Sequence, residues 1–461
     1  MNGKTVWERA GAREAAEAFC EGYKDFLNRC KTERETAARV AAMAEEAGFK
    51  NLDTLLAEGT PLQAGDKVYS LMHRKAAALF VMGTEPLSRG MRLICAHGDA
   101  PRLDLRPRPL FEKEGLALLR THYYGGIKKY QWAAMPLALH GVIVKKGGER
   151  IPVSIGEEEG EPVLYISDLP KHLSAKQSQQ TMAEGITGED LNLIAGSIPL
   201  EGEGPGGYLL KLLYEKYGVE EEDLLCAELE AVPAGKARDA GLDGSMIAAY
   251  GHDDRSCAYA GLQAILETKA PVHTAGFMLV DKEEVGNQGA TGMQSRMLEN
   301  LTAKLLHLQG DSSPLSLRLA LEQSQLLSAD VVLGMDPGHG ECFAPGNTAH
   351  LGGGPAIVKY AGHFGKKDAN DANAEFLGLL RDVFDGENIC WQTGEYGRMD
   401  LGGGGTIAPL PARYGMQVAD CGVPLLSMHA PYELASKADV YEASRAYSAF
   451  LRSAATMDAY M

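Results

Sequence analysis

The sequence predicts an α/β protein with a mixed, mostly parallel sheet flanked by helices and interrupted by a β-rich insertion. Three observations carry this prediction. After residue 244, apolar runs of strand length alternate with helical patterns, which is typical of a mostly parallel sheet. The stretch 104–243 lacks this alternation and contains mainly strand and turn patterns. The length of 461 residues exceeds that of one small domain, so a second, inserted domain is expected.

The segments before the insertion are expected to be mainly helical. Near the N-terminus, apolar side chains recur every three or four positions from Ala12 to Phe26 and form one apolar stripe. A second helix is predicted over 32–46. The segment 91–107 is expected to begin as a strand and to end in a loop at Pro101.

The insertion is expected to contain hairpins. The stretch "ALHGVIVKKGGERIPVSIG" (138–156) has two strand-like halves around a pair of glycines, which predicts a β-hairpin. We assign 104–243 to the inserted domain. Residues 1–103 and 244–461 are then the two parts of a discontinuous α/β domain.

The elements predicted after the insertion follow the alternation in order. They are a helix over 253–269, a strand running into a turn over 274–286, a helix over 294–309, a strand over 328–336, a helix over 371–384, a strand over 388–393, a strand-rich stretch over 415–429 and a closing helix over 438–460.

The composition excludes several classes of partner. The formal net charge is −17, which argues against nucleic acids and anionic membrane surfaces, because both need basic patches. The eight cysteines form no Cys-x-x-Cys pair, as expected for reduced, mostly buried thiols. No stretch has the length and apolar character of a membrane span or a signal peptide. A cytoplasmic protein is therefore expected.

Polar side chains gather where predicted strands end, and open α/β sheets place their functional sites there. Taken singly, most have an ordinary explanation, such as a turn, a helix cap or a buried histidine. Asp330 is harder to explain, because it is predicted to lie inside an apolar strand and a buried carboxylate needs a partner. The candidates are His97, Asp99, Asp253, Asp254, Glu283, Glu284, Asp330 and His429.

Taken together, these residue types suit a centre of two metal ions. Two zinc ions about 3.5–4 Å apart need about three protein ligands each, with one carboxylate shared. Histidine and carboxylate ligands are typical of hydrolytic zinc, whereas thiolates favour structural sites. One further carboxylate must accept a proton from water. The adjacent Glu283 and Glu284 could supply a ligand and this base, and two cations would relieve their mutual repulsion.

Eight motifs extend in a fixed order over nearly the whole chain. They are "AHGDAPRLDLRP", "THYYGGIKKYQW", "HDDRSCAY", "DKEEVG", "SADVVLGMDP", "GGPAIVK", "GGTIAPL" and "GVPLLSMHAPYEL". On these motifs the chain resembles the aspartyl aminopeptidases, a family of dinuclear zinc exopeptidases, and most closely their bacterial branch.

The resemblance implies a role for each matching position. Terminal zinc ligands are matched by His97, Glu284, Asp330 and His429, and the bridging ligand by Asp253. Asp99 matches a carboxylate that orients the zinc-bound histidine, and Glu283 matches the general base. Asp254 stands where many members have Asn and is not counted as a ligand. His172, in "ISDLPKHLSAKQ" at the start of an expected helix, matches a histidine that reaches into the partner subunit's active site.

The resemblance also implies an activity, cofactors and an assembly. The activity is removal of N-terminal residues, acidic ones among them, from peptides by zinc-activated water. The cofactors are two Zn²⁺ per subunit, with Co²⁺ or Mn²⁺ as substitutes. The implied fold is a zinc-peptidase α/β domain with an inserted β-rich dimerisation domain, and the implied assembly is a homo-oligomer whose dimers form a tetrahedral dodecamer.

The chain departs from the family where an acidic side chain would be recognised. Lys359 in "GPAIVK" is expected to pair with the substrate carboxylate. A histidine found three residues beyond the Asp330 position in eukaryotic members is Leu333 here, and the Arg of their "SMHSIRE" pattern is Tyr432. A specificity broader than Asp and Glu is therefore left open.

Two other functions are also left open by the sequence. A deacylase or carboxypeptidase would share the metal ligands and differ only in its pocket. A non-catalytic assembly protein could retain the fold, but it would have no use for a carboxylate that is spare beside the ligands. Metal-dependent release of amino acids from peptides would separate these functions.

Overall fold

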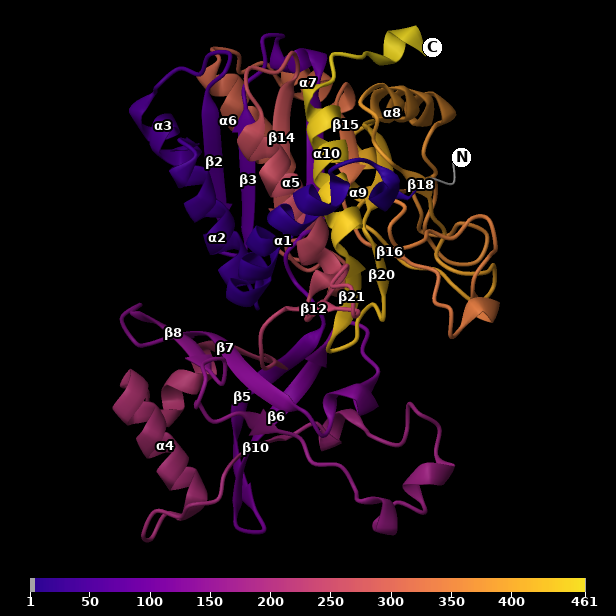
Figure 1. Cartoon of the computed structure of the whole chain (residues 1–461). Coiled ribbons are helices and arrows are strands. Elements are labelled where there is room, and N and C mark those ends of the chain that lie inside the picture. The colour runs from indigo at the N-terminus through magenta and orange to yellow at the C-terminus, as the bar shows by residue number, and fades with distance from the viewer. Residues whose placement is uncertain (1–4, 461) are drawn as a thin grey trace. The chain divides into compact units, whose positions relative to one another are not determined.

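The computed structural model describes residues 5–460 and divides the chain into two compact units (Figure 1). One unit consists of Met1–Asp99, Arg238–Met428 and Glu433–Met461. The other consists of Ala100–Ala237 and the short segment His429–Tyr432.

A nine-stranded mixed sheet forms the centre of the first unit. Its central strands β14, β4, β15 and β19 are parallel to one another, whereas β3 and β17 run antiparallel to their neighbours β14 and β19. In spatial order the strands are β1 (Lys50–Asn51), β2 (Lys67–Met72), β3 (Ala76–Val81), β14 (Thr274–Val280), β4 (Met91–His97), β15 (Gln325–Ser328), β19 (Gln417–Gly422), β17 (Ala356–Val358) and β18 (Gln392–Thr393).

Helices accompany this sheet. The expected second helix is confirmed as α2 and begins with a capping box, in which Thr32 and Glu35 bind each other's backbone N–H groups. The helices are α1 (Ala12–Arg29), α2 (Glu33–Glu46), α3 (Leu52–Glu58), α5 (His252–Glu267), α6 (Met297–Leu308), α7 (Pro314–Glu322), α8 (Ala374–Gly386), α9 (Pro409–Ala412) and α10 (Lys437–Arg452). The closing helix, expected to reach residue 460, ends at Arg452. Between residues 5 and 460, no helix combines the length and apolar character needed to span a membrane.

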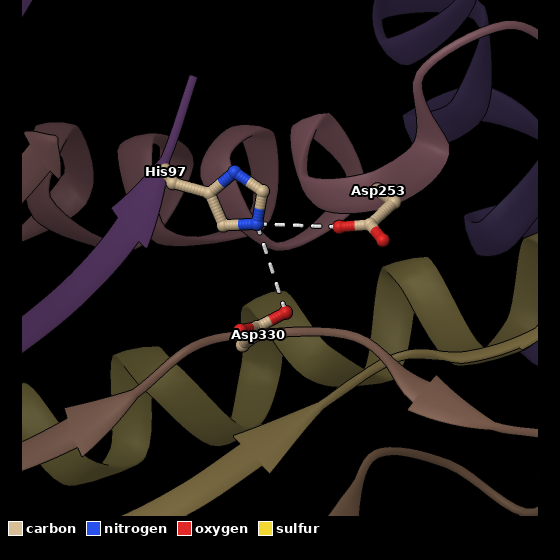
Figure 2. A group of neighbouring side chains, drawn as sticks. All are labelled: His97, Asp253 and Asp330. Atoms are coloured by element: carbon tan, nitrogen blue, oxygen red, sulfur yellow. Dashed lines mark ion pairs between the residues drawn. The ribbon is translucent and has the colours of Figure 1, made fainter. Parts of the chain in front are cut away.

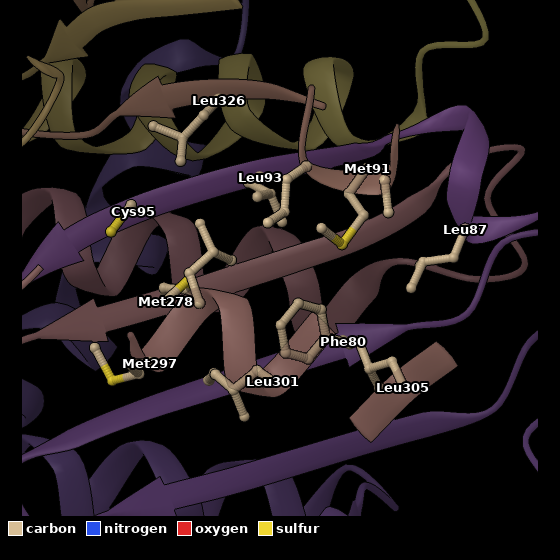
Figure 3. Close-up of a cluster of buried hydrophobic side chains, with 14 of the residues drawn as sticks. Phe80, Leu87, Met91, Leu93, Cys95, Met278, Met297, Leu301, Leu305 and Leu326 are labelled. Carbon is tan, nitrogen blue, oxygen red and sulfur yellow. The ribbon is translucent and has the colours of Figure 1, made fainter. Parts of the chain in front are cut away.

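These helices pack against apolar side chains on both faces of the sheet. Leu93 and Met278 lie in one cluster with Leu301 of α6 (Figure 3). On the opposite face, α5 approaches so closely that a Cβ on Gly261 would lie 2.9 Å from the ring of Phe277. The central strands are therefore buried on both faces, which explains their continuous apolar sequence.

A smaller five-stranded sheet corrects one prediction. It consists of β12 (Arg238–Ala240), β13 (Met246–Ala249), β21 (Glu433–Ser436), β20 (Pro424–Leu426) and β16 (Val332–Leu333). The single strand expected over 328–336 is wrong, because β15 ends at Ser328 in the large sheet and β16 begins at Val332 in the small one. Asp330 lies in the break between them rather than inside a strand.

The second unit is a seven-stranded sheet with one helix. It closes on itself, because β11 pairs with both β5 and β7. The strands are β5 (Arg102–Lys113), β6 (Leu116–Tyr124), β7 (Pro136–Val144), β8 (Arg150–Ile155), β9 (Leu164–Tyr165), β10 (Leu193–Gly196) and β11 (Ala227–Pro233). The hairpin predicted over 138–156 is confirmed as β7–β8. The loop expected at Pro101 gives way at once to β5, and the helix α4 (Gly204–Tyr217) was not predicted.

Candidate metal centre

Three of the predicted ligands meet at the carboxyl ends of the central strands. His97 is the last residue of β4, Asp253 lies in the first turn of α5 and Asp330 follows β15. The Nε2 atom of His97 lies 3.2 Å from Oδ1 of Asp253 and 3.8 Å from Oδ1 of Asp330 (Figure 2). All three side chains are buried. Because β4 and β15 are parallel neighbours, their carboxyl ends share one edge of the sheet, and this brings the three residues together.

Asp253 also belongs to a second group of carboxylates. An oxygen of Asp253 and an oxygen of Glu284 lie within 4.8 Å of each other, as do the ligand atoms of His97, Asp253 and Asp330. Ligand atoms around one zinc ion with bonds of about 2.1 Å lie up to about 4 Å apart, so a small inward movement would close each group on an ion. Asp253 is the residue that the two groups share.

Asp99 holds three of the other candidates, His97, Glu283 and Glu284, by hydrogen bonds. The Nδ1 atom of His97 lies 3.0 Å from the backbone oxygen of Asp99 and 3.4 Å from its Oδ1. This fixes Nδ1 as a donor and directs Nε2 at Asp253 and Asp330, where it can bind a metal ion once it carries no proton. The two carboxylate oxygens of Asp99 accept the N–H groups of Glu283 and Glu284, each at 3.2 Å. Asp99 thus fixes three neighbouring candidates, His97 through its backbone oxygen and the two glutamates through its carboxylate.

The centre has a strong requirement for positive charge. Burial lowers the pKa of His97, but hydrogen bonds to Asp253, Asp330 and Asp99 outweigh it and raise this pKa well above its usual value. Burial raises the pKa of Glu283 to about 8, and the charge of Asp330 adds to the rise. A bound divalent cation would supply the positive charge that protons supply in its absence, and the donors are all imidazole or carboxylate. These residues therefore fit zinc.

Two further carboxylates accept hydrogen bonds from the backbone N–H groups of proposed ligands. Asp254 is buried, and its Oδ2 accepts the backbone N–H of His97 at 3.1 Å. Burial raises the pKa of Asp254 well above its usual value. Glu433 was missed by the sequence analysis, although it lies in the "APYEL" motif. Its Oε2 accepts the backbone N–H of Asp253 at 3.0 Å and so fixes the residue that both groups share.

Glu283 and Glu284 lie in a short 3-10 turn that follows β14. The turn, Glu283–Val285, is preceded by Lys282 and followed by Gly286, both with a left-handed backbone. The pair therefore lies on a tight turn beyond the end of the strand. The predicted base and the predicted ligand are neighbours on one turn, as the sequence suggested.

The remaining predicted ligand belongs to the segment grouped with the second unit. His429 lies in the four-residue stretch His429–Tyr432, between β20 and β21. Its Nδ1 lies 2.8 Å from the backbone oxygen of Gly126. That carbonyl makes Nδ1 the donor and leaves Nε2 as the atom able to bind a metal.

Two predicted site residues remain, His172 in the second unit and Lys359 in the first. His172 is exposed in the 3-10 turn Lys171–Leu173 of the second unit, so the helix expected there is wrong. Lys359 is exposed and lines a pocket of about 480 Å³ beside α8, together with Arg381 and Trp391. The preceding residue, Val358, has the opposite orientation and is buried with Val332.

Comparison with known proteins identifies what this arrangement is similar to. Residues 26–451 match the family described as "Aminopeptidase I zinc metalloprotease (M18)". A probable M18 family aminopeptidase 1 from Clostridium acetobutylicum is 49% identical over 97% of this chain and 98% of its own length. The crystal structure of an M18 family aminopeptidase from Thermotoga maritima is 40% identical, covers 98% of this chain and 99% of its own, and superimposes with a TM-score of 0.94. The crystal structure of aminopeptidase I from Clostridium acetobutylicum, 45% identical over 98% and 99% of the two chains, gives a TM-score of 0.91.

Proposed function

The chain belongs to the M18 family and is a zinc metalloaminopeptidase, and from this premise we propose that its active centre holds two zinc ions per subunit. The ligands would be His97, Asp253, Glu284, Asp330 and His429. The observation that carries this proposal is the position of Asp253, whose carboxylate lies within 4.8 Å of ligand atoms in two separate groups. A carboxylate shared in this way is what two ions about 3.5–4 Å apart require.

The residues around the ions have separable tasks. Zinc, when bound, polarises the scissile carbonyl and makes water acidic enough to lose a proton near neutral pH. Glu283 accepts this proton and later donates it to the leaving amine. Burial opposes the ionisation of Glu283, whereas bound cations would favour it. Asp99 holds the backbone of Glu283 and the ring of His97 in place.

We further propose that His172 acts in the active site of a partner subunit. The support is its exposed position in the second unit, together with the family resemblance of its motif. Each active site would then need two chains, and the working form would be a homo-oligomer of dimers, a dodecamer in its largest form. An imidazole in this role would donate a hydrogen bond to the oxyanion that develops on the substrate. The proposed substrates are peptides in the cytoplasm.

A metal-removal experiment tests the two-ion proposal. Dialysis against a chelator should abolish release of amino acids from peptides with a free N-terminus, and zinc, cobalt or manganese should restore it. Peptides with a blocked N-terminus should resist the enzyme throughout. Elemental analysis should find about two metal ions per chain in the wild type and almost none in Asp253→Ala, because both ions lose a ligand. A full content of one ion per chain with full activity would refute the two-ion centre.

A further inference from the structure

Asp330, like His429, is a proposed ligand whose backbone belongs to no strand or helix. His97 ends a strand and Asp253 begins a helix, but Asp330 lies in the break between β15 and β16. A ligand on irregular backbone needs other contacts to hold it within the few tenths of an ångström that metal geometry tolerates. We propose that Tyr396 is a positioning residue that holds Asp330 in place, an inference that rests on the metal centre proposed above.

Tyr396 acts on the peptide unit between Val331 and Val332, one residue beyond Asp330. Its phenol donates a hydrogen bond of 2.8 Å to the backbone oxygen of Val331. The next residue is tied as well, because the N–H of Val332 donates to the oxygen of Val423 at 3.0 Å. The backbone is therefore held immediately after Asp330, on the side where the chain leaves the large sheet for the small one.

The carbonyl group of Asp330 itself is confined by close packing against β19. A Cβ on Gly422 would lie 1.7 Å from the backbone oxygen of Asp330. Only glycine permits this approach, so the oxygen of Asp330 rests directly against the strand. Together with the phenol of Tyr396, this contact fixes the two successive carbonyl groups that determine where the Asp330 side chain starts.

The ring of Tyr396 is itself fixed by apolar packing. It packs against the buried cluster formed by Val332, Ala349, Ala356 and Val358. This cluster joins β16 of the small sheet to β17 of the large sheet. Tyr396 thus connects the two sheets at the point where Asp330 lies between them. Its pKa is raised well above its usual value, first by burial and then by the charge of Asp330, so the phenol remains a neutral donor.

The structure offers a matched control for this contact. Tyr447, in α10, is fully buried, and its phenol donates a hydrogen bond of 2.7 Å to the backbone oxygen of Cys421 in β19. Tyr396→Phe and Tyr447→Phe each remove one hydroxyl from a bond to a backbone carbonyl, and neither changes the charge. Only the first of these bonds lies next to a proposed ligand.

The experiment measures zinc affinity in the full-length protein by competition with a chromophoric chelator. Loss of a residue that orients a ligand typically weakens metal binding by about 10–100-fold. Because Tyr396 acts through one peptide unit, we expect the lower end, about tenfold, for Tyr396→Phe and less than about twofold for Tyr447→Phe. Unfolding temperatures in excess chelator should fall by similar amounts in the two variants, which controls for general loosening.

Each result gives a definite answer. Equal loss of zinc affinity in both variants, or no loss in Tyr396→Phe, would overturn the role of Tyr396. Asp330→Ala keeps this outcome distinct from a failure of the metal centre itself. If Asp330→Ala binds zinc as the wild type does, the assignment of Asp330 is wrong. If Asp330→Ala weakens binding and Tyr396→Phe does not, only the positioning role fails.

Discussion

At the scale of single residues, the adjacent Glu283 and Glu284 illustrate how one anchor separates two tasks. Both N–H groups are held by the Asp99 carboxylate, so the two side chains leave a fixed turn at fixed positions. An oxygen of Glu284 lies within 4.8 Å of an Asp253 oxygen, as a co-ligand should. Glu283 combines a carboxyl whose burial opposes ionisation with a location beside the proposed ligands. The two neighbours are therefore proposed to have different roles.

Isosteric substitutions should separate these two tasks. Glu283→Gln should retain both metal ions and lose about 10²–10⁴-fold in turnover, because a general base is removed and no ligand is. Glu284→Gln should instead lower the metal content, because an amide is a poorer ligand than a carboxylate. Elemental analysis and peptide hydrolysis check both statements. The reverse pattern would exchange the two roles, and unchanged turnover in both variants would remove the pair from the active site.

His252, a buried histidine that is not a proposed ligand, makes the stability of the folded protein depend on pH. His252 donates from Nε2 to the oxygen of Ile247 at 3.0 Å, and its Nδ1 accepts from the phenol of Tyr23 at 2.7 Å. Burial lowers the pKa of His252 to about 4. In the unfolded chain this pKa is about 6.5, so between these values the unfolded state binds the extra proton. The stabilising effect of the neutral ring is complete above about pH 6.5 and is lost as pH falls toward 4.

This dependence can be measured as a difference between two proteins. Between pH 7.5 and pH 5, His252 should make the wild type lose about 2 kcal/mol of stability, since one proton is worth about 1.4 kcal/mol per pH unit. His252→Gln has no titrating group and should lose correspondingly less, whatever its own stability. Denaturant unfolding in chelator, which removes metal linkage, gives both slopes. Parallel slopes in the two proteins would show that His252 does not titrate on unfolding.

At this scale the sequence indicated candidate ligands, but it did not indicate the residues that hold those ligands in place. His97, Asp253 and Asp330 could be chosen because polar residues at strand ends converge on one edge. Glu433 could not, because its contact is with a backbone N–H from a distant helix and leaves no pattern in sequence. Asp254 was not counted among the ligands, and its contact with the backbone of His97 appears only in the fold.

At the scale of elements, the alternation of side chains along β17 and the direction of this strand decide where Lys359 lies relative to the proposed metal centre. In β17, Ala356 and Val358 are buried with Val332, whereas Ile357 and the residue that follows the strand, Lys359, line the pocket beside α8. The strand also runs antiparallel to β19, pairing Ala356 with Gly422 and Val358 with Asp420. Lys359 is thus carried away from the edge where Asp330 lies. This register argues against contact between Lys359 and the side chain of a bound substrate.

Charge reversal tests this register. Lys359→Glu should change the ratio of Asp to Leu cleavage by less than about twofold, because the new carboxylate would face α8. Lys366→Glu is the control for net charge, since Lys366 is also exposed and pairs with Asp371 at 2.8 Å. Rates on peptides that differ only in their first residue give the ratio. If Lys359→Glu alone lowered the cleavage rate of peptides with an acidic first residue by tenfold or more, the role expected from the sequence would be supported.

The elements that sequence patterns missed share a physical cause. The alternation after residue 244 predicted α5, β14, α6 and α8 within a few residues, because each has a strong apolar period of its own. The expected strand over 328–336 was wrong because both halves are apolar, and only pairing with β19 or β20 decides which sheet each half joins. Local sequence does not encode such a change of partner.

At the scale of the whole molecule, the chain contains two units whose residues must cooperate if the proposed function is correct. The second unit is contributed by one long excursion from the first and by the four residues His429–Tyr432. The excursion carries His172 on an exposed turn, and the first unit carries Glu283. If His172 serves the active site of a partner subunit, activity belongs to the assembled protein and not to one chain.

Loss of His172 alone should be felt in turnover and not in metal binding. His172→Ala should lower turnover by about 10²–10³-fold, as removal of one oxyanion donor does. Metal content should stay at the wild-type level, because the side chain is not among the proposed ligands. A fall in metal content would place His172 among the ligands instead.

Subunit mixing gives the sharpest test of this arrangement. His172→Ala and Glu283→Gln should each be almost inactive as pure proteins, because every active site lacks one of the two groups. In a mixed dimer, the site that receives His172 from the Glu283→Gln chain has an intact Glu283 from the His172→Ala chain. Activity should therefore reappear when subunits exchange, up to about one quarter of the wild-type rate in a random mixture, since half the dimers are mixed and each has one complete site. Exchange is followed independently with chains labelled by two fluorophores. A mixture that exchanges fully and stays inactive would show that His172 serves its own chain or no active site, whereas recovery requires a site built from two chains.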